Sequence, residues 1–358
     1  MITSTKHHKA MNKPTYHFVH PAFKLNGFHL TEEDLARIAY SFIKEGEPYE
    51  RAVGDFLLDW FDHREYIEMQ TSGTTGLPKM IKVDKQAMVN SAIATGNFFD
   101  LEPGIRVLHC LPTQFVAGKM MLVRAFILGW DMDLVAPAAT PLERLDTVYD
   151  FCAMVPMQAE RSLLRLKQIK KLILGGAKVS QALSKQLQGL PTEVYETYGM
   201  TETITHIAAK RVGEEAFTVL PDVNISEDDR HCLVIDPYAI CDEPVITNDV
   251  VKVINDKQFI WLGRYDNVIN SGGVKLYPEQ IEEKLSEHVD RRFFVKGMPD
   301  ETLGEKLVLV IEGEPYKVED TIFTDLGKFE KPKDILFIPK FAETVSGKVI
   351  RDKTLEMV

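Results

Sequence analysis

The sequence predicts an α/β protein with a large first domain and a smaller second one, and three observations lead to this. Its 358 residues exceed what one ordinary core supports, and 45% hydrophobic residues can fill a sizeable core. Up to about residue 220, short strand-like runs alternate with helical patterns, which is typical of a largely parallel sheet covered by helices. Beyond that point, closely spaced alternating strands and then a helix between strands indicate a separate small α+β domain.

The elements follow in order along the chain. Two amphipathic helices are expected first, over 31–43, with an N-terminal cap, and over 49–61. Strands of the parallel sheet are expected where β-prone runs stop at Gly or Pro, at 106–112, 132–137, 171–176 and 192–199. Helices are expected between them, including 85–99 and 118–130. An antiparallel sheet or small β-barrel-like part is expected from 231–236, 250–256 and 258–263. The second domain is expected to contain a helix at 278–289 and strands at 292–297 and 306–313.

Charge and cysteine content exclude several classes of function. Lys and Arg number 42 and Asp and Glu number 53, a net charge of −11, so a nucleic-acid partner or an anionic membrane surface is not expected. The four cysteines lie far apart, which indicates neither a zinc site nor a disulfide framework but reduced core thiols. There is no signal peptide and no long apolar run, so a cytoplasmic location is expected. A homo-oligomer is left open.

The segment "TSGTTGLPKM" at 71–80 is a candidate anion-binding loop. Its glycines allow consecutive backbone N–H groups to converge on an anion, while hydroxyl groups and a lysine add donors and charge. Phosphate is the natural guest, although a surface hairpin loop has the same composition. The spacing excludes a Walker loop, because the lysine lies three residues beyond the second glycine. The candidate phosphate-binding residues are Thr71, Ser72, Gly73, Thr74, Thr75, Gly76 and Lys79.

This segment resembles the phosphate loop of the adenylate-forming enzymes, which include acyl- and aryl-CoA synthetases, and four further matches follow in the family's order. They are "ILGGAKVS" (173–180), "YETYGMTET" (195–203), "LGRYDNVINSGGVKLYPEQIE" (262–282) and "SGKVIRDKTL" (346–355). The resemblance runs from about residue 70 to the end. It implies a large nucleotide- and acid-binding domain at 1–265 and a small mobile C-terminal domain at 266–358, with Asp266 as the hinge.

The same motifs supply nucleotide and metal contacts. Tyr198 can stack on a purine, and Glu202 can hold Mg²⁺ through its carboxylate; the resemblance gives both residues these roles and adds Thr201 as a nucleotide contact. In isolation the segment is equally a strand end followed by a helix start. The resemblance also places the adenine beside a glycine segment and the end of the following strand, at Gly175, Gly176, Ala177 and Gly199.

Around the domain boundary, the resemblance assigns further cofactor contacts. Asp249 occupies the place of the ribose-binding aspartate, although Asn248 stands where the family has glycine, and a turn aspartate before a strand is the alternative. Arg264 corresponds to a ribose and phosphate arginine. Ser271, Gly272 and Gly273 resemble the loop that lines the pantetheine tunnel, while a plain hairpin turn looks the same in isolation.

The reaction follows from the resemblance and uses ATP, Mg²⁺ and coenzyme A. Lys348 would enter the active site and stabilise charge that develops on the transferring group. A substrate carboxylate attacks the α-phosphate of ATP to give an acyl-adenylate and pyrophosphate. The small domain then rotates about Asp266, withdraws Lys348 and lets the thiol of CoA attack the acyl carbon.

The segment "HCLPTQFVAGKMMLVRAF" (109–126) bears on the acid. It most resembles the form in o-succinylbenzoate–CoA ligases of menaquinone biosynthesis, which carry a proline, a small-residue turn and a helix with an arginine. Here these are Pro112, Gly118 and Arg124, whereas the family's usual histidine is Phe115, preceded by Gln114.

The second carboxylate of succinylbenzoate needs a cationic partner, for which Lys119 and Arg124 are the candidates. Five residues apart on a helix, they point about 140° away from each other, so one of them faces the acid. A solvated helix face is the alternative and is favoured for Lys119.

Other functions stay open at this point. Only 70 residues precede the loop, fewer than the family normally has, which fits a compact ligase for a small acid. The alternatives are a ligase for another small aryl or acyl acid, a module that loads a carrier-protein thiol, and a degenerate nucleotide-binding protein. Lys348 speaks against the last, because a pure binder does not need it.

Overall fold

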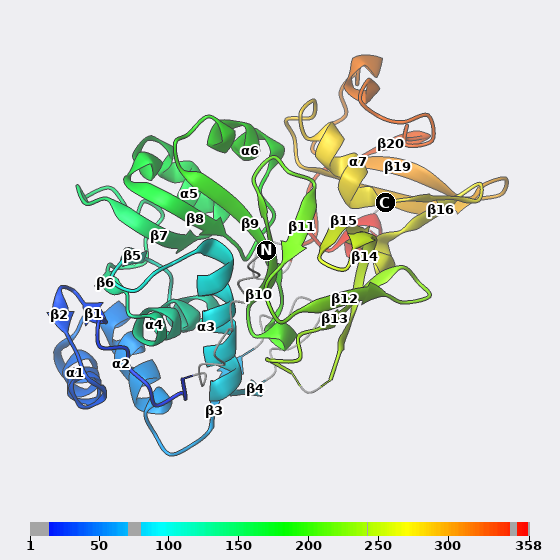
Figure 1. Ribbon diagram of the computed structural model, residues 1–358. Helices are drawn as coiled ribbons and strands as arrows, with labels where there is room; N and C mark the ends of the chain where they lie inside the picture. The colour runs from blue at the N-terminus through cyan, green and yellow to red at the C-terminus, as the bar shows by residue number, and fades with distance from the viewer. Residues whose placement is uncertain (1–13, 71–79, 242, 344–348, 357–358) are drawn as a thin grey trace, which may run out of the picture.

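The computed structural model describes residues 14–70, 80–241, 243–343 and 349–356. The central feature is a long mixed sheet with the strand order β12-β13-β14-β15-β11-β10-β9-β8-β7-β5-β6-β1-β2 (Figure 1). Its parallel part is β6 (Asp131–Leu134), β5 (Arg106–His109), β7 (Tyr149–Met154), β8 (Ile169–Leu174) and β9 (Glu193–Gly199). The four predicted strands of this part are therefore confirmed, each within a few residues of the expected range.

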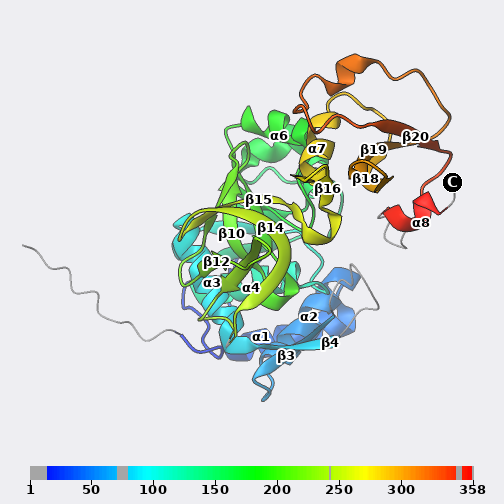
Figure 2. The ribbon, with the colours of Figure 1, turned by 90° about the vertical axis from the view of Figure 1, so that its right-hand side faces the viewer.

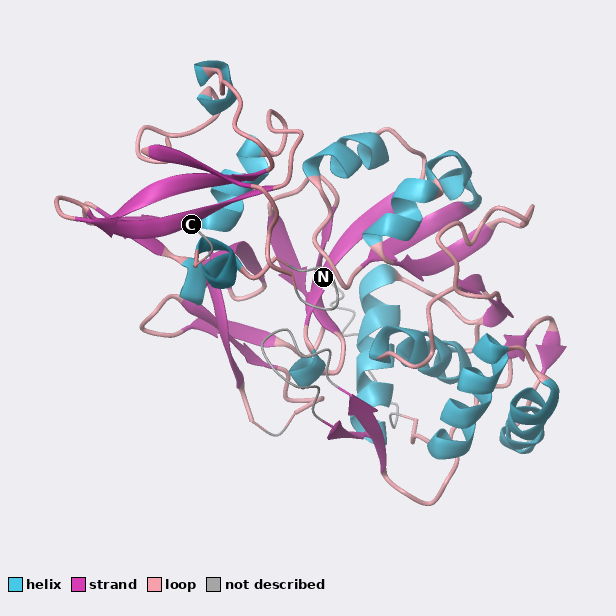
Figure 3. Ribbon diagram, turned by 180° about the vertical axis from the view of Figure 1, so that it is seen from behind, coloured by secondary structure: helices cyan, strands magenta, loops and turns pink. Residues whose placement is uncertain are grey.

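Helices cover both faces of the parallel strands, as the predicted strand–helix alternation requires (Figures 1 and 3). One face packs against α3 (Lys85–Phe99) and α4 (Val116–Leu128), and the other against α5 (Pro156–Arg161), η1 (Leu163–Gln168) and α6 (Gln181–Gln188). The two faces have separate hydrophobic clusters because successive strand residues point to opposite sides. Val107 belongs to the cluster beneath α3 and α4, and Leu108 to the cluster beneath α6.

The N-terminal elements extend the first face. β1 (Lys24–Leu25) pairs parallel with β6 and carries β2 (Phe28–His29) at the sheet's end. The predicted helices are α1 (Glu32–Glu45) and α2 (Pro48–Trp60), and a separate two-stranded sheet is formed by β3 (Tyr66–Gln70) and β4 (Met80–Asp84). The expected cap of α1 is a capping box, in which Thr31 Oγ1 accepts from the Asp34 N–H and Asp34 accepts from the Thr31 N–H.

The three strands predicted as an antiparallel or barrel-like part are β13 (Cys232–Asp236), β14 (Val245–Asn255) and β15 (Gln258–Arg264), and they continue the same sheet. Three further strands of this part were not predicted: β10 (His206–Arg211), β11 (Ala216–Val219) and β12 (Asn224–Glu227). Each pairs antiparallel with its neighbour, and β10 joins this part to β9. Phe217 and Phe259 stack in its core, with ring centroids 5.5 Å apart.

A second sheet with its own core follows η3 (Tyr265–Asn267) (Figure 2). It comprises β16 (Ile269–Ser271), β17 (Val274–Leu276), β18 (Phe293–Asp300), β19 (Gly304–Glu312) and β20 (Asp334–Ile338). Its helical elements are α7 (Pro278–Leu285), η4 (Asp320–Phe323) and α8 (Arg351–Leu355). The predicted helix and strands of a small α+β unit are thus present, whereas the division at residue 266 and its mobility stay predictions.

Three of the four cysteines, Cys110, Cys152 and Cys232, are buried. Cys110 and Cys152 lie on neighbouring parallel strands with their sulfur atoms 3.8 Å apart, and burial raises the pKa of Cys152 well above its usual value. Within the ranges that the structure describes, no helix combines the length and apolar character needed to cross a bilayer.

Candidate functional site

The predicted adenine-side residues lie at the carboxyl ends of β8 and β9, where β9 runs three residues beyond the last residue of β8. Parallel strands bring their carboxyl ends to one edge, and in α/β sheets this edge is where ligands bind. A hydrogen bond ties the end of β8 to β9, because Thr197 Oγ1 donates to the Leu174 carbonyl at 2.9 Å. Gly176 has a φ of +80°, which other residues resist, and Ala177 follows it. The structure therefore brings Gly175–Ala177 beside the strand that carries Tyr198 and Gly199.

The Asp249 carboxylate is a buried hub beside this edge. Oδ2 accepts the Tyr198 hydroxyl at 2.8 Å, and Oδ1 accepts the Trp261 indole N–H at 3.1 Å. Arg264 Nη1 lies 3.9 Å from Oδ1, and the β14–β15 register pairs Asp249 with Arg264 directly. Burial, followed by the Asp249 charge, raises the pKa of Tyr198 far above its ordinary value, so its proton stays in this hydrogen bond.

Sequence reasoning placed Tyr198, Asp249 and Arg264 in the nucleotide site and missed Trp261. The "QFIWLG" run carries no signal for the side chain's hydrogen bond, because the contact depends on the pairing of two strands. The Tyr198 ring also packs against Phe217 and Phe259, with centroids 5.8 and 5.3 Å away. The orientation of the Tyr198 side chain is therefore fixed both by these ring contacts and by the hydrogen bond of its hydroxyl.

The asparagine that replaces the family's glycine connects this hub to the predicted hinge. Asn248 Oδ1 accepts from Arg230 at 2.9 Å, and its amide lies 3.5 Å from the Asp266 carboxylate, a distance at the limit of a hydrogen bond. Arg264 Nη2 is 3.6 Å from the same carboxylate. Asp266 is thus placed between the nucleotide-side residues and the second sheet.

The predicted pantetheine loop is a tight hairpin between β16 and β17. Gly272 and Gly273 have φ values of +58° and +81°, the two positive values that a two-residue hairpin turn of this kind needs. Ser271 pairs with Val274 across the turn. The hairpin is real, and its contact with a ligand stays a prediction.

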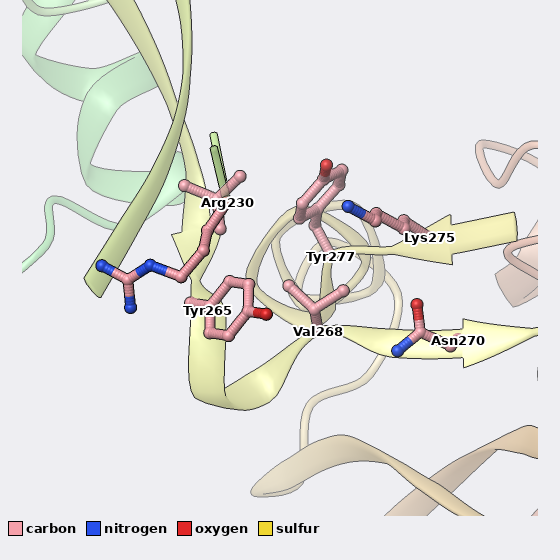
Figure 4. A pocket seen from close by; sticks show the side chains of 7 residues that line it. Arg230, Tyr265, Val268, Asn270, Lys275 and Tyr277 are labelled. Carbon is pink, nitrogen blue, oxygen red and sulfur yellow. The ribbon is translucent and has the colours of Figure 1, made fainter. Parts of the chain in front are cut away.

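A pocket of about 240 Å³ is lined in part by β16 and β17, the two strands of this hairpin. None of the predicted site residues line it. It is lined by Arg230, Val250, Tyr265, Val268, Asn270, Lys275 and Tyr277 (Figure 4). The Arg230 guanidinium points away from Lys275 and is held by Asp228 at 2.7 Å. The two cations therefore do not converge on one point.

The structure describes only some of the predicted metal-binding and catalytic residues. Thr201 and Glu202 form a single helical turn, η2 (Thr201–Thr203), directly after β9, and Glu202 is exposed. No cluster of three or more metal-ligating residues occurs among the residues the structure describes. Magnesium commonly takes one or two carboxylates and completes its shell with phosphate oxygens and water, so a lone Glu202 fits an ATP-bound ion. The 71–79 loop and Lys348 lie outside the described residues.

The acid-side segment forms the start of α4. Gln114 and Phe115 are exposed before the helix, with 65% of Phe115 accessible. Gly118 is required by close packing, since a Cβ there would lie 2.4 Å from the Pro112 carbonyl oxygen. Gly118 was predicted to form a turn before the helix, but it lies in the first turn of α4 itself.

Lys119 and Arg124 point to different places, as their spacing predicted. Lys119 donates to the Thr113 carbonyl at 3.0 Å and lies 5.2 Å over the Phe56 ring of α2. Burial lowers its pKa, so the solvated helix face favoured for this residue is wrong: its stem packs between two helices.

Arg124 is buried, with 2% of its surface exposed, and faces the start of β10. Its Nη2 donates to Thr205 Oγ1 at 3.2 Å and lies 3.4 Å from His206 Nδ1, while Nη1 reaches only the Met121 sulfur at 3.9 Å. Nε has no partner, and Arg124 forms no ion pair with any described residue. Burial lowers its pKa to about 9. Sequence reasoning missed Thr205 and His206, because their role depends on a helix 81 positions earlier.

Comparison with known proteins agrees with this fold. A profile of the family described as AMP-binding enzyme matches residues 66–237. The chain is 24% identical to 2-succinylbenzoate–CoA ligase of Lactococcus lactis over 90% of its own length and 77% of the relative's. It is 25% identical to indoleacetate–CoA ligase of Aromatoleum aromaticum, over 80% and 66% of the two chains.

Solved structures extend the comparison. An acyl-CoA synthetase (AMP-forming)/AMP-acid ligase II-like protein of Dyadobacter fermentans is 36% identical, with a TM-score of 0.62, over 90% of this chain and 98% of that one. The o-succinylbenzoate–CoA synthetase of Bacillus subtilis, solved with ATP and magnesium, shares the fold with a TM-score of 0.68 at 18% identity, over 91% and 82% of the chains.

Proposed function

Because the chain belongs to the AMP-binding enzyme family, we propose that it is an acid–CoA ligase whose acid is o-succinylbenzoate. In the first step, a carboxylate oxygen bonds to the α-phosphorus of ATP while the bond to the β-phosphate breaks and pyrophosphate leaves. In the second step, the thiolate of CoA bonds to the acyl carbon, the bond to AMP breaks, and the thiol proton passes to solvent. Relatives that act on 2-succinylbenzoate match along 90% of this chain, which supports the proposal.

The described residues have roles consistent with the first step. Asp249 accepts the ribose hydroxyls, held in place by Tyr198 and Trp261, and Arg264 contributes positive charge beside it. Glu202 supplies a carboxylate for magnesium, which when bound neutralises charge on the phosphates. Lys79 and Lys348, both outside the described residues, are the proposed cations for the phosphates and for the reacting carboxylate.

The observation that carries the choice of acid is Arg124. A buried guanidinium normally pairs with an anion, since an uncompensated buried charge is costly. This one has a free Nε and no carboxylate partner in the part of the chain that the structure describes. A dicarboxylic acid can supply that partner: one carboxylate reacts and the other pairs with Arg124. Lys119, directed to α2, is not proposed for this role.

The test is mass spectrometry of the protein incubated with ATP, Mg²⁺, CoA and one acid: o-succinylbenzoate, benzoate, indoleacetate or a medium-chain fatty acid. We expect succinylbenzoyl-CoA with AMP and pyrophosphate. A thioester formed only with another acid would retain the chemistry and reject the substrate. The absence of adenylate and thioester with every acid would reject the proposal and favour a nucleotide-binding protein.

Two variants sharpen this test. Lys348→Ala should abolish adenylate formation while ATP still binds. Arg124→Met should raise KM for o-succinylbenzoate by about 10- to 100-fold, the loss of a charge-assisted hydrogen bond. The control is Arg165→Met, an exposed arginine paired with Asp146 far from α4, which should behave like the unchanged protein.

A further inference from the structure

The segment between β9 and β10 has a strained backbone. Ile204 has φ 65° and ψ −54°, and the Thr205 N–H donates to the Thr203 carbonyl at 2.7 Å. These values describe a γ-turn of the rare form with positive φ at its centre, an unfavourable conformation for a β-branched residue. Such strain persists only where the surroundings impose it and is concentrated at functional sites.

The turn directs Thr205 and His206 toward α4. Both side chains contact Arg124 Nη2, at 3.2 Å from Thr205 Oγ1 and 3.4 Å from His206 Nδ1. The β9–β10 register shifts between His206 and Ala208, so the ladder itself is irregular at this place. Backbone irregularity next to an active site commonly serves to aim a side chain.

The hydrogen bonds on the far side of His206 fix its tautomer. Thr95 Oγ1 donates to the Ser91 carbonyl at 3.0 Å, so its oxygen is left to accept from His206 Nε2, 3.4 Å away. If Nε2 carries the proton, Nδ1 has a free lone pair. That lone pair faces a guanidinium, which is only a donor. Burial, reinforced by the charge of Arg124, lowers the pKa of His206 well below its usual value, so the ring is neutral.

We propose that His206 is a positioning residue for substrate selection: its Nδ1 accepts from Arg124 and, with Thr205, holds the guanidinium so that the unpartnered Nε–H remains for the second carboxylate of a dicarboxylic acid. The proposal rests on the proposed function and deepens it. His206 itself does not touch the acid. Its contribution is to fix the guanidinium through Nη2, which leaves the Nε–H to donate to the acid.

The experiment compares two variants of the full-length protein with two acids. His206→Leu removes both ring nitrogens, whereas His206→Asn keeps a polar group near the position of Nδ1. The control is His109→Leu, because His109 is equally buried but contacts Thr113 and not Arg124. For each protein, kcat and KM are measured with o-succinylbenzoate and with benzoate.

We expect His206→Leu to lower kcat/KM for o-succinylbenzoate by about 10- to 100-fold, mainly through KM, the loss expected when one bond to a charged group is removed. The change with benzoate should be much smaller, His206→Asn should recover most of the loss, and His109→Leu should keep the ratio of the two acids. An equal loss with both acids would mean a structural role and overturn the proposal.

The same measurements distinguish failure of the proposed function from failure of the proposed role of His206. If the unchanged protein prefers o-succinylbenzoate and His206→Leu keeps that preference, the positioning role is wrong while the function stands. If the unchanged protein does not prefer the dicarboxylic acid, the proposed substrate fails, and the role of His206 fails with it.

Discussion

Asp249 shows how one residue can be held ready for a ligand. Its carboxylate is 7% exposed, and its two oxygens already accept from Tyr198 and Trp261. Each oxygen retains a further lone-pair site, so a ribose hydroxyl can be added without breaking either bond. Two fixed partners reduce the freedom that ATP binding would otherwise have to remove.

We therefore expect Asp249→Asn to weaken ATP binding by about 10- to 100-fold, because the hydrogen bonds to a charged acceptor are lost. The asparagine oxygen can still accept from Tyr198, so the protein should remain folded. Isothermal calorimetry with ATP gives the affinity, and thermal unfolding checks the fold. Tyr198→Phe, which removes one donor but keeps the charge, should have a smaller effect. Equal affinity of Asp249→Asn and the unchanged protein would remove Asp249 from the nucleotide site.

An ion pair with a buried lysine connects the residues after α2 to the start of α3. Lys85 opens α3 with no exposed surface, and its Nζ donates to Asp62 Oδ1 at 2.9 Å. A cation at a helix N-terminus is unfavourable by itself, so Asp62 is its compensation. Burial alone would raise the pKa of Asp62, but hydrogen bonds from Lys85 and Arg64 outweigh it and lower the pKa to about 2.

A pKa depressed in the folded state contributes stability above the unfolded value, and this contribution is lost as the pH falls through the folded value. The shift from 3.8 to about 2 corresponds to roughly 2 kcal/mol. The free energy of unfolding of Asp62→Asn should thus be below that of the unchanged protein at pH 7. This difference should shrink by roughly 2 kcal/mol between about pH 5 and pH 2. Urea unfolding at several pH values measures it, and a difference independent of pH would contradict the assignment.

The close pairing of β9 with the start of β10 leaves no room for a side chain at Gly199. A Cβ there would lie 2.3 Å from the Thr205 carbonyl oxygen and 2.4 Å from the His206 Cα, both backbone atoms that cannot rotate away. Gly199→Ala should therefore cost about 1–3 kcal/mol of stability and also lower kcat/KM for the acid, because β10 carries His206. Gly189→Ala is the matched control, since its Cβ would meet only the Gln186 oxygen at 3.8 Å. Unfolding and turnover of both variants, compared with the unchanged protein, decide the point.

Local patterns predicted the elements well and the long-range contacts poorly. The helix predicted over 85–99 matches α3 to the residue, and in the structure Asp84 caps it and a left-handed Asp100 ends it. The barrel-like part is instead the end of one long sheet, since strand patterns do not specify which strands are neighbours. The same limit explains Lys119, Trp261 and His206: their partners lie on other elements, and sequence alone gives no register between them.

At the scale of the molecule, the two sheets meet through helices and a few polar contacts. Lys178 pairs with Glu283 at 2.8 Å, and Lys185 of α6 with Glu287 at 2.6 Å. Gln280 of α7 donates to the Trp261 carbonyl at 3.2 Å. These contacts hold one arrangement of the C-terminal part (Figure 2), and they are the kind that can be exchanged for others at modest cost.

If the C-terminal part rotates between the two chemical steps, this arrangement serves one step and competes with the other. Each exposed pair contributes about 0.2–1 kcal/mol, so Lys178→Glu combined with Lys185→Glu should change the population ratio by about 2- to 30-fold. We expect the rates of pyrophosphate release and of thioester formation to change in opposite directions. Stopped-flow measurement of both rates tests this, and high salt should weaken the difference because it screens exposed charges. Lys170→Glu, which breaks a pair with Asp150 within the large sheet, is the control. If both rates fall together, the two pairs stabilise the fold and do not govern a rotation.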